Sequence, residues 1–215
     1  MRFGTYYRYA IVKKLKLTNF IRLTDSVLDI GCYDGMFLQS LIVKERIGMD
    51  LIAIKQKNIH IIKASAEYFP FRGDSIDVMT AFDVLEHIQD QIRLIRQVNA
   101  ILKRQGLFIF TVPYEKEKIF PKFLNNWLNF SRWGHKRVGY NQDSLKKLFK
   151  GDWNMKVLYW NTALSNILYF PLQLLWKLFQ RFTKLIINKI IEIEYMKTKK
   201  SSLPQGHFIV IAKKQ

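Results

Sequence analysis

The residues best suited to hold a ligand form a short loop with two glycines. One acidic residue opens the loop, and another follows at the end of the next apolar run. The apolar run 26–30 contains Asp29 and leads into Gly31-Cys32-Tyr33-Asp34-Gly35, after which the spacing becomes helical. Glycine lets the backbone turn tightly and approach a bound molecule closely. Asp50 ends the next apolar run about 20 residues farther on, where a carboxylate can accept hydrogen bonds from both hydroxyls of a ribose. The pattern predicts a nucleotide-like ligand, but the G-x-G-x-x-G spacing of dinucleotide sites is absent.

Strand-like and helical segments alternate through the first half of the chain. Helical spacing runs over 36–42 and 87–102, and a further short helix is expected at 143–149. The short apolar, β-type runs are 26–30, 46–49, 59–63, 75–81 and 107–112. Such alternation predicts βαβ units with right-handed crossovers, and therefore a parallel sheet with helices on both faces.

Two more strands are expected late in the chain, at 155–160 and 207–212, separated by far more residues than a hairpin needs. We therefore expect an α/β fold with a doubly wound, Rossmann-like sheet, mostly parallel with a late antiparallel strand, plus a helical insertion. Residues 1–161 and 206–215 are expected to form the sheet domain, and 162–205 an amphipathic helical insertion.

Five short motifs follow one another along the first half. They are V-L-D-I-G-C-Y-D-G at 27–35, I-G-M-D-L at 47–51, A-S-A-E-Y-F-P-F at 64–71, S-I-D-V with D-V-L-E-H within 75–87, and L-K-R-Q-G at 102–106. In this order they resemble the motifs of class I S-adenosylmethionine-dependent methyltransferases, in the small-molecule branch of types 11 and 12. The resemblance covers roughly residues 20–113 and implies S-adenosyl-L-methionine as the cofactor. The cofactor-binding residues that it implies are Asp29, Gly31, Cys32, Tyr33, Gly35, Asp50, Leu51, Ser65, Ala66, Glu67, Phe82 and Asp83.

The chain departs from the family pattern at two of these positions. Tyr33 stands where the loop usually has its middle glycine, and Ser65 stands where an aspartate often receives the adenine amino group. Glu67 or the Ala66 backbone amide is expected to compensate for the missing aspartate through its own contact with the adenine. A buried carboxylate at a strand end costs free energy unless it is used, which favours a functional role for Asp29 over simple capping of the next helix.

Two histidines are candidates for a catalytic base. Methyl transfer from a sulfonium is an in-line displacement in which the protein mainly positions the acceptor, and a base is needed only for a hydroxyl acceptor. His87 follows the fourth strand, and His135 lies in W-G-H-K-R at 133–137, which is similar to a segment of related enzymes acting on sugars, quinols or lipid-linked acceptors. Imidazole titrates near neutrality, although either ring could instead be packed for structural reasons. One cysteine and four histidines form no cluster that predicts a metal site.

The net charge is +18, from 35 Lys+Arg and 17 Asp+Glu. Such an excess indicates a polyanionic partner, either nucleic acid or an anionic membrane, with a solvated lysine-rich surface as the alternative. Residues 103–215 hold 21 of the basic but only 6 of the acidic residues, so the excess lies outside the motif-bearing half. A hydrophobic content of 49% excludes wholesale disorder. Without an apolar N-terminal run, we expect a cytoplasmic protein, peripheral on the inner face of the membrane.

The segment 164–193 has apolar residues at helical spacing. They are Leu164, Leu168, Leu172, Leu175, Phe179, Phe182, Ile186, Ile190 and Ile193, and at 100° per residue they share one face. The opposite face carries Gln173, Lys177, Arg181, Lys184 and Asn188. This basic amphipathic pattern predicts a helix lying in a membrane interface. A span over the uncharged 157–176 is disfavoured by its polar residues and Pro171, and a cap on the pocket or a dimer interface are further alternatives.

The leading hypothesis is a methyltransferase whose acceptor is small or lipid-linked (a quinol, a glycan or another amphipathic hydroxyl compound), working at a membrane surface contacted through 164–193. An RNA methyltransferase is the weaker alternative, because the sequence has neither an RNA-binding module nor an N-P-P-Y motif. A non-catalytic cofactor-binding or assembly protein is the third. The oligomeric state is left open.

Overall fold

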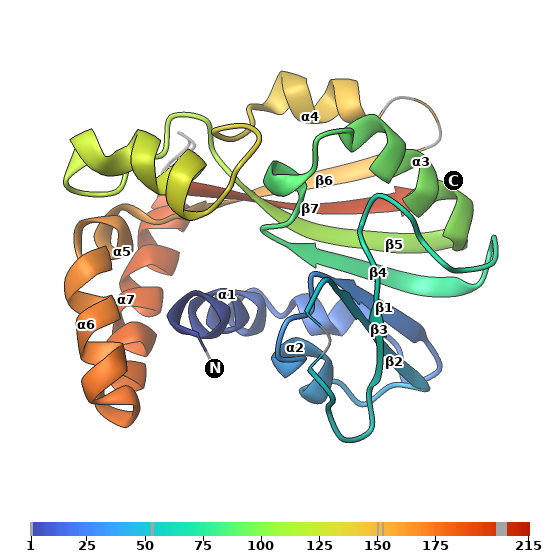
Figure 1. The fold of residues 1–215 in the computed structure, drawn as a ribbon, viewed down its shortest axis with the longest axis horizontal. Helices are drawn as coiled ribbons and strands as arrows, with labels where there is room; N and C mark the ends of the chain where they lie inside the picture. The colour runs from blue at the N-terminus through green and yellow to red at the C-terminus, as the bar shows by residue number, and fades with distance from the viewer. Residues whose placement is uncertain (1, 53, 150, 152, 201–205) are drawn as a thin grey trace.

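A seven-stranded sheet forms the centre of the residues that the computed structural model describes, which are 2–52, 54–149, 151, 153–200 and 206–215 (Figure 1). The strands are β1 (Ser26–Ile30), β2 (Glu45–Asp50), β3 (His60–Lys63), β4 (Ile76–Phe82), β5 (Leu102–Pro113), β6 (Trp153–Asn161) and β7 (Gly206–Lys214). Their order is β3-β2-β1-β4-β5-β7-β6, with parallel pairs from β3 to β5 and β7 antiparallel to both of its neighbours. The expected fold class, a Rossmann-like sheet that is mostly parallel with a late antiparallel strand, is confirmed.

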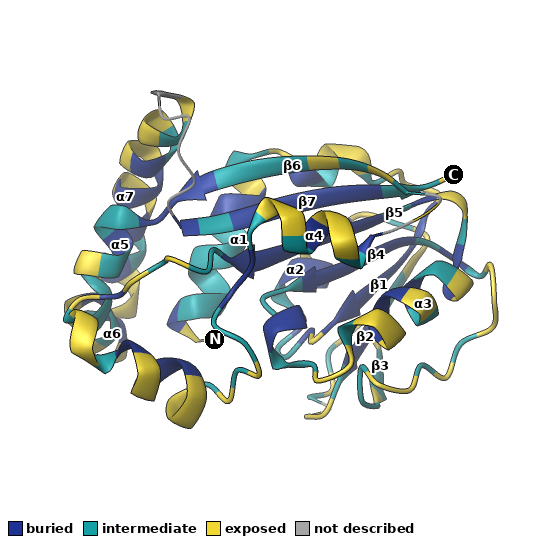
Figure 2. Ribbon diagram, turned by 90° about the horizontal axis from the view of Figure 1, so that it is seen from above, coloured by how far each residue is buried: buried dark blue, intermediate teal, exposed yellow. Residues whose placement is uncertain are grey.

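Helices cover both faces of this sheet. They are α1 (Phe3–Lys14), α2 (Met36–Gln39), α3 (Gln91–Ile101), α4 (Gln142–Leu148), α5 (Ala163–Ile167), α6 (Tyr169–Leu178) and α7 (Gln180–Lys200), with short turns η1 (Leu17–Phe20), η2 (Leu85–His87), η3 (Lys122–Leu124) and η4 (Trp127–Arg132). Helices α3 and α4 pack on the face that carries Phe108 and Phe110. Helices α1, α2, α6 and α7 pack on the other face, around Ile109 and Ile209 (Figures 1 and 2). Alternate residues of β5 thus serve two cores, as the period of two in a strand requires.

Three elements differ from their expected bounds by three residues or more. The helix expected over 36–42 ends at Gln39, where the Ser40 hydroxyl donates to the Phe37 carbonyl oxygen at 2.6 Å and competes with the helical backbone. The helix expected from 87 begins only at Gln91, because the Asp90 side chain accepts from the Arg93 amide and caps it. Strand β5 begins five residues before 107, where Leu102 pairs with Ile76 ahead of a shift in register.

The segment 164–193 is not one amphipathic helix, so the expectation of a single apolar face is wrong. The backbone leaves the helical region at Phe179 (φ −136°, ψ 61°), which separates α6 from α7 and breaks the angular relation between their side chains. Phe179 and Phe182, expected on the apolar face, are 59% and 58% exposed. The buried positions of α7 are Thr183, Ile187, Ile190, Ile191 and Glu194. No helix in the described ranges combines the length and the apolarity that crossing a bilayer requires.

Glu194 fixes this helical segment to the rest of the fold. Its side chain is fully buried and accepts hydrogen bonds from the Tyr7 hydroxyl, from the Ser165 amide at 2.8 Å and from the Trp160 indole at 3.2 Å. These donors belong to α1, α5 and β6. One carboxylate therefore joins three elements that are distant in sequence.

We expect Glu194→Ala to lower the free energy of unfolding by about 3 kcal/mol, because several buried donors lose their acceptor and each costs roughly 1–3 kcal/mol when unpaired. Urea unfolding followed by circular dichroism measures the change. The control is Glu192→Ala, which removes an exposed ion pair with Lys14 and should cost under about 1 kcal/mol. Equal losses in the two variants would contradict the role of Glu194.

Candidate functional site

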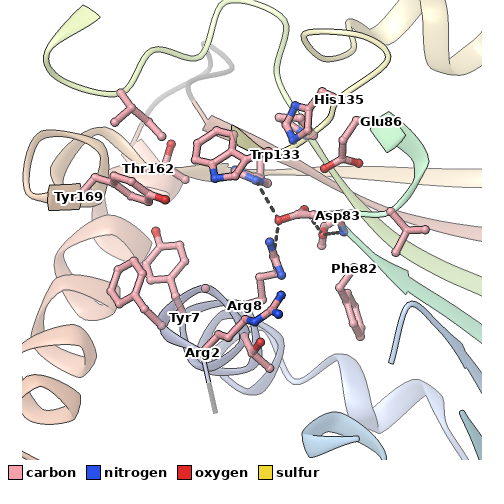
Figure 3. A pocket seen from close by; sticks show the side chains of 18 of the residues that line it. Arg2, Tyr7, Arg8, Phe82, Asp83, Glu86, Trp133, His135, Thr162 and Tyr169 are labelled. Carbon is pink, nitrogen blue, oxygen red and sulfur yellow. Dashed lines mark hydrogen bonds and ion pairs between the residues drawn. The ribbon is translucent and has the colours of Figure 1, made fainter. Parts of the chain in front are cut away.

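A cavity of about 930 Å³ lies at the carboxyl ends of the central strands. The loops after β1, β2 and β4 form one side of it, and α1 forms the wall opposite. The segment between β5 and α4 covers it together with α5 and α6 (Figure 3). Ligands of open α/β sheets bind at this edge, so the position agrees with the site expected from the glycine loop.

The cofactor loop and Asp50 form one end of this cavity. Both Asp50 carboxylate oxygens accept backbone hydrogen bonds at 2.9 Å, one from the Tyr33 amide and one from the Ile52 amide. Each oxygen keeps a second lone pair for a ligand, which is what a ribose-binding acid needs. Gly31 has φ +71°, and a Cβ there would lie 2.6 Å from Cγ2 of Val84, so only glycine fits.

The structure brings together some of the residues that the sequence implicated and not others. Those that line the cavity are Gly31, Tyr33, Asp50, Phe82, Asp83, His87 and His135. The expected cofactor residues outside its lining are Asp29, Cys32, Gly35, Leu51, Ser65, Ala66 and Glu67. Contacts of this second group with a cofactor stay predictions.

Local contacts explain the positions of several residues in the second group. Cys32 is buried against Gly48 of β2, and burial raises the pKa of its thiol to about 12, so it is no nucleophile. The Ser65 hydroxyl accepts from the Glu67 amide at 3.2 Å. Leu51 is 67% exposed.

Asp29 is held inside the sheet. Its carboxylate accepts from the Thr80 hydroxyl at 2.6 Å, and its side chain is buried. Burial, with repulsion from Asp50 and Asp34, raises the pKa of Asp29 to about 7 despite that hydrogen bond. The ionised carboxylate therefore destabilises the cofactor-free protein at neutral pH.

Asp29→Asn should stabilise the cofactor-free protein increasingly as pH rises from about 4 to about 8. A raised folded-state pKa means that stability is lost between the unfolded value and about 7. A shift of about three units corresponds to a gain of at most ~4 kcal/mol at pH 8 and little at pH 4. Urea unfolding at the two pH values measures it, and a gain that does not change with pH would refute this account of Asp29.

Asp83 anchors a charged cluster at the base of the cavity, which Figure 3 shows with its partners. It pairs with Arg8 of α1, accepts from the Thr111 hydroxyl at 2.6 Å, and lies 3.4 Å from Nε2 of His207. The His207 ring lies on its other side 3.2 Å from Glu117. Burial would raise the pKa of Asp83, but Arg8 and His207 more than offset it, and the pKa falls well below its usual range. Burial likewise opposes charging of His207, but the two carboxylates raise its pKa well above the ordinary value.

The sequence motifs give no sign of this cluster. Arg8, Glu117 and His207 lie outside the motifs and meet Asp83 only through α1, the segment after β5, and β7. Asp83 was expected to contact the cofactor, but its carboxylate is occupied by protein partners.

His87 and His135 meet in another part of the cavity lining. Their ring centroids are 4.7 Å apart and the rings are perpendicular. The backbone explains the encounter, because the Lys136 amide donates to the Glu86 carbonyl oxygen at 2.7 Å and ties the segment after η4 to η2. Trp133 packs beside the His135 ring at a centroid distance of 5.4 Å, and Tyr169 and Tyr7 continue the aromatic lining away from the histidines (Figure 3).

Burial shifts the pKa values of the two histidines and of Glu86 beside them. It lowers the pKa of His135 to about 4, with a further contribution from His87, and it also lowers the pKa of His87. Burial and the charge of Asp83 raise the pKa of Glu86 to about 8. Glu86, His87 and His135 each offer an oxygen or nitrogen atom, and these atoms all lie within 4.8 Å of one another. The sequence does not predict this grouping, because His135 is 48 residues from His87.

Comparison with known proteins agrees with this geometry. A family model described as a methyltransferase domain matches residues 3–155, more than half of the chain. An uncharacterized protein of Methanocaldococcus jannaschii is 37% identical over 109 residues, 47% of this chain and 42% of that one. A probable S-adenosylmethionine-dependent methyltransferase of Mycobacterium tuberculosis is 26% identical over 96 residues, 40% of this chain and 35% of that one. The chain thus spans less than half the length of these two curated relatives.

Solved structures share the fold over nearly the whole chain. YcgJ of Bacillus subtilis covers 97% of this chain and 99% of its own, with a TM-score of 0.62 and 19% identity. Phosphoethanolamine N-methyltransferase 2 of Haemonchus contortus, solved with phosphomonomethylethanolamine and S-adenosylhomocysteine, has a TM-score of 0.65 at 15% identity and covers 95% of this chain and 52% of its own. With the family model, the seven-stranded sheet and the glycine loop in agreement, this chain belongs to the class I S-adenosylmethionine-dependent methyltransferases.

Proposed function

We propose that the chain transfers a methyl group from S-adenosyl-L-methionine to a hydroxyl of a small or lipid-linked amphipathic acceptor, such as a quinol or a glycan, at a membrane surface. The observation that carries the proposal is the continuity of one cavity from Asp50 and the glycine loop to the histidine pair. A cofactor and an acceptor can therefore lie end to end, as an in-line displacement needs.

The protein itself forms no covalent bond in this reaction. The methyl carbon leaves the sulfonium sulfur and bonds to the acceptor oxygen, while the hydroxyl proton passes to a base. Asp50 and the backbone around Gly31 orient the cofactor. His135 and His87 line the same cavity as that loop, and either imidazole can take the proton.

The lining supports an amphipathic acceptor. Trp133, Tyr7 and Tyr169 offer aromatic surface, and Arg132 and Lys177 also border the cavity. Aromatic walls suit an apolar or ring-containing group, and the cations suit a phosphate or carboxylate attached to it. This combination favours a lipid-linked or similarly two-sided molecule over a simple metabolite.

One end of the molecule has the chemistry of a membrane-facing surface. The segment 119–132 turns Ile119, Asn125 and Asn129 towards the cavity, while Phe123 and Trp127 on it are 82% and 48% exposed. Helices α6 and α7 lie at the same end of the molecule (Figure 1). Their exposed apolar side chains include Leu174, Leu178, Phe179, Phe182 and Leu185. Exposed aromatics on a chain of net charge +18 are typical of proteins that bind anionic bilayers.

The test of the acceptor is methyl transfer from labelled S-adenosyl-L-methionine into fractionated lipid, glycan and RNA extracts. Label in an amphipathic lipid or glycan fraction, released from carbon–oxygen bonds, is the expected result. Label confined to RNA would replace the proposal with the RNA alternative. No label in any fraction, by protein that binds the cofactor, would favour the non-catalytic alternative.

The membrane surface has its own test. Wild-type protein is expected to float with vesicles of phosphatidylcholine and phosphatidylglycerol, and Phe123→Asp/Trp127→Asp should reduce the bound fraction at least ~10-fold, because charges replace the inserted aromatics. Ile92→Asp is the matched control, since Ile92 is 58% exposed on α3, away from this end (Figure 1). Equal flotation of the double variant, or no flotation of wild-type protein, would end the membrane proposal.

A further inference from the structure

Three side chains with metal-binding atoms converge at the acceptor end of the cavity. Glu86 offers a carboxylate oxygen and His87 and His135 each offer a ring nitrogen, all within 4.8 Å of one another. Figure 3 shows Glu86 and His135 side by side above Asp83. The three residues come from η2 and from the segment after η4, which the Lys136–Glu86 backbone hydrogen bond holds together.

Two atoms of this group lack a protein partner. Oε2 of Glu86 and Nδ1 of His135 are buried, and no described group hydrogen-bonds to either. Glu86 as a whole is only 1% exposed, so water does not readily replace the missing partner. Buried polar atoms of this kind are rare, and each needs an explanation such as an ion.

The positively charged side chains near Glu86 are paired with another carboxylate. Arg8 and His207 both pair with the Asp83 carboxylate and not with that of Glu86. Oε2 of Glu86 therefore has no described hydrogen-bond partner that would compete with a cation.

We propose that Glu86, His87 and His135 bind a divalent transition-metal cation such as Zn²⁺. One carboxylate and two imidazoles form a ligand set that such ions accept with positions left open for another molecule. Around a tetrahedral ion with bonds of ~2.0–2.1 Å, ligand atoms lie ~3.3 Å apart. Binding thus needs the ligand atoms to approach one another by up to ~1.5 Å.

The open positions face the cavity where the acceptor is expected. An acceptor hydroxyl bound to the cation would release its proton more readily, and to solvent water, because both imidazoles would then be ligands. The cation would stabilise the resulting oxyanion until its oxygen bonds to the methyl carbon. This role in catalysis rests on the proposed function. Cation binding itself does not, and it can be measured without an acceptor.

The test uses full-length protein stripped with a chelator and then titrated with Zn²⁺ by calorimetry and with Co²⁺ by visible absorption. We expect one equivalent to bind, and His135→Ala and Glu86→Gln each to weaken binding at least ~100-fold. The matched control is His60→Ala, which removes an exposed histidine on β3 and should leave binding unchanged. Each variant is also checked for S-adenosyl-L-methionine binding, which confirms that it is folded.

The outcomes separate this inference from the proposed function. Absence of saturable binding, or binding of equal strength in His135→Ala, overturns the cation site even if methyl transfer proceeds. Binding of one equivalent that needs Glu86 and His135 supports the site even if no acceptor is methylated.

Discussion

Replacement of Asp50 by alanine is expected to weaken S-adenosyl-L-methionine binding by roughly 100-fold or more. Its carboxylate is held by the Tyr33 and Ile52 amides and borders the cavity. Hydrogen bonds to a charged group contribute about 1.5–3 kcal/mol each, and the substitution would remove the hydrogen bonds from both ribose hydroxyls at once. Since about 1.4 kcal/mol is tenfold in affinity, calorimetric titration with the cofactor will resolve the effect easily.

The control for this experiment lies on the same strand. Glu45 begins β2 at the opposite end, where it accepts from the Ser26 hydroxyl at 3.0 Å. Glu45→Ala removes an acid of the same strand without touching the cavity, so cofactor affinity should not change. Undiminished affinity in Asp50→Ala would remove the ribose-binding role of this residue.

His135→Ala is expected to lower the rate of methyl transfer by about 10²- to 10⁴-fold, the usual contribution of a positioned proton acceptor. The loss is expected whether His135 takes the proton itself or holds a cation that activates the acceptor. Its effect on S-adenosyl-L-methionine affinity should be small, because the ring packs on His87 and Trp133, which belong to other segments than Asp50 and the glycine loop. The rate is measured with labelled cofactor and the extract fraction that accepts methyl groups.

His60→Ala serves again as the control, because it removes an imidazole from the exposed edge strand β3. Full activity in this variant and a large loss in His135→Ala would support a role at the cavity. A His135→Ala enzyme with an unchanged rate would show that neither the base nor the cation role is needed.

The strands of the sheet could be predicted well, because each is marked by a short apolar run in the sequence. The strand expected over 26–30 agrees with β1 residue for residue, since an unbroken apolar run between polar residues marks a strand covered on both faces. Asp50 is found at the cavity for the same reason, because a strand and its following loop fix the position of one side chain. The antiparallel β7 also follows from an apolar run and the family resemblance.

The features that the sequence did not reveal depend on distant contacts. No glycine or proline marks the break between α6 and α7 at Phe179. The apolar residues therefore keep a helical spacing across 164–193 although the helix is interrupted there. Which face of α7 is buried is decided by α1 and β6, not by its own periodicity. Glu86 and His135 are 49 residues apart and meet because hydrogen bonds join their segments, among them the bond from the Lys136 amide to the Glu86 carbonyl oxygen.

The position of β7 between β5 and β6 has a consequence for the order of folding. Among the described strands, β6 pairs with β7 alone, so it has no ladder in the sheet until β7 is in place. Helix α7 packs on β6, and the hairpin of α6 and α7 therefore also waits for that pairing. We expect the half of the sheet that carries Asp50 to form first, through contacts that are close in sequence, and the wall around the histidine pair to close last. In a partly folded chain the cofactor loop would then be formed, while the acceptor part of the cavity would still be open to solvent.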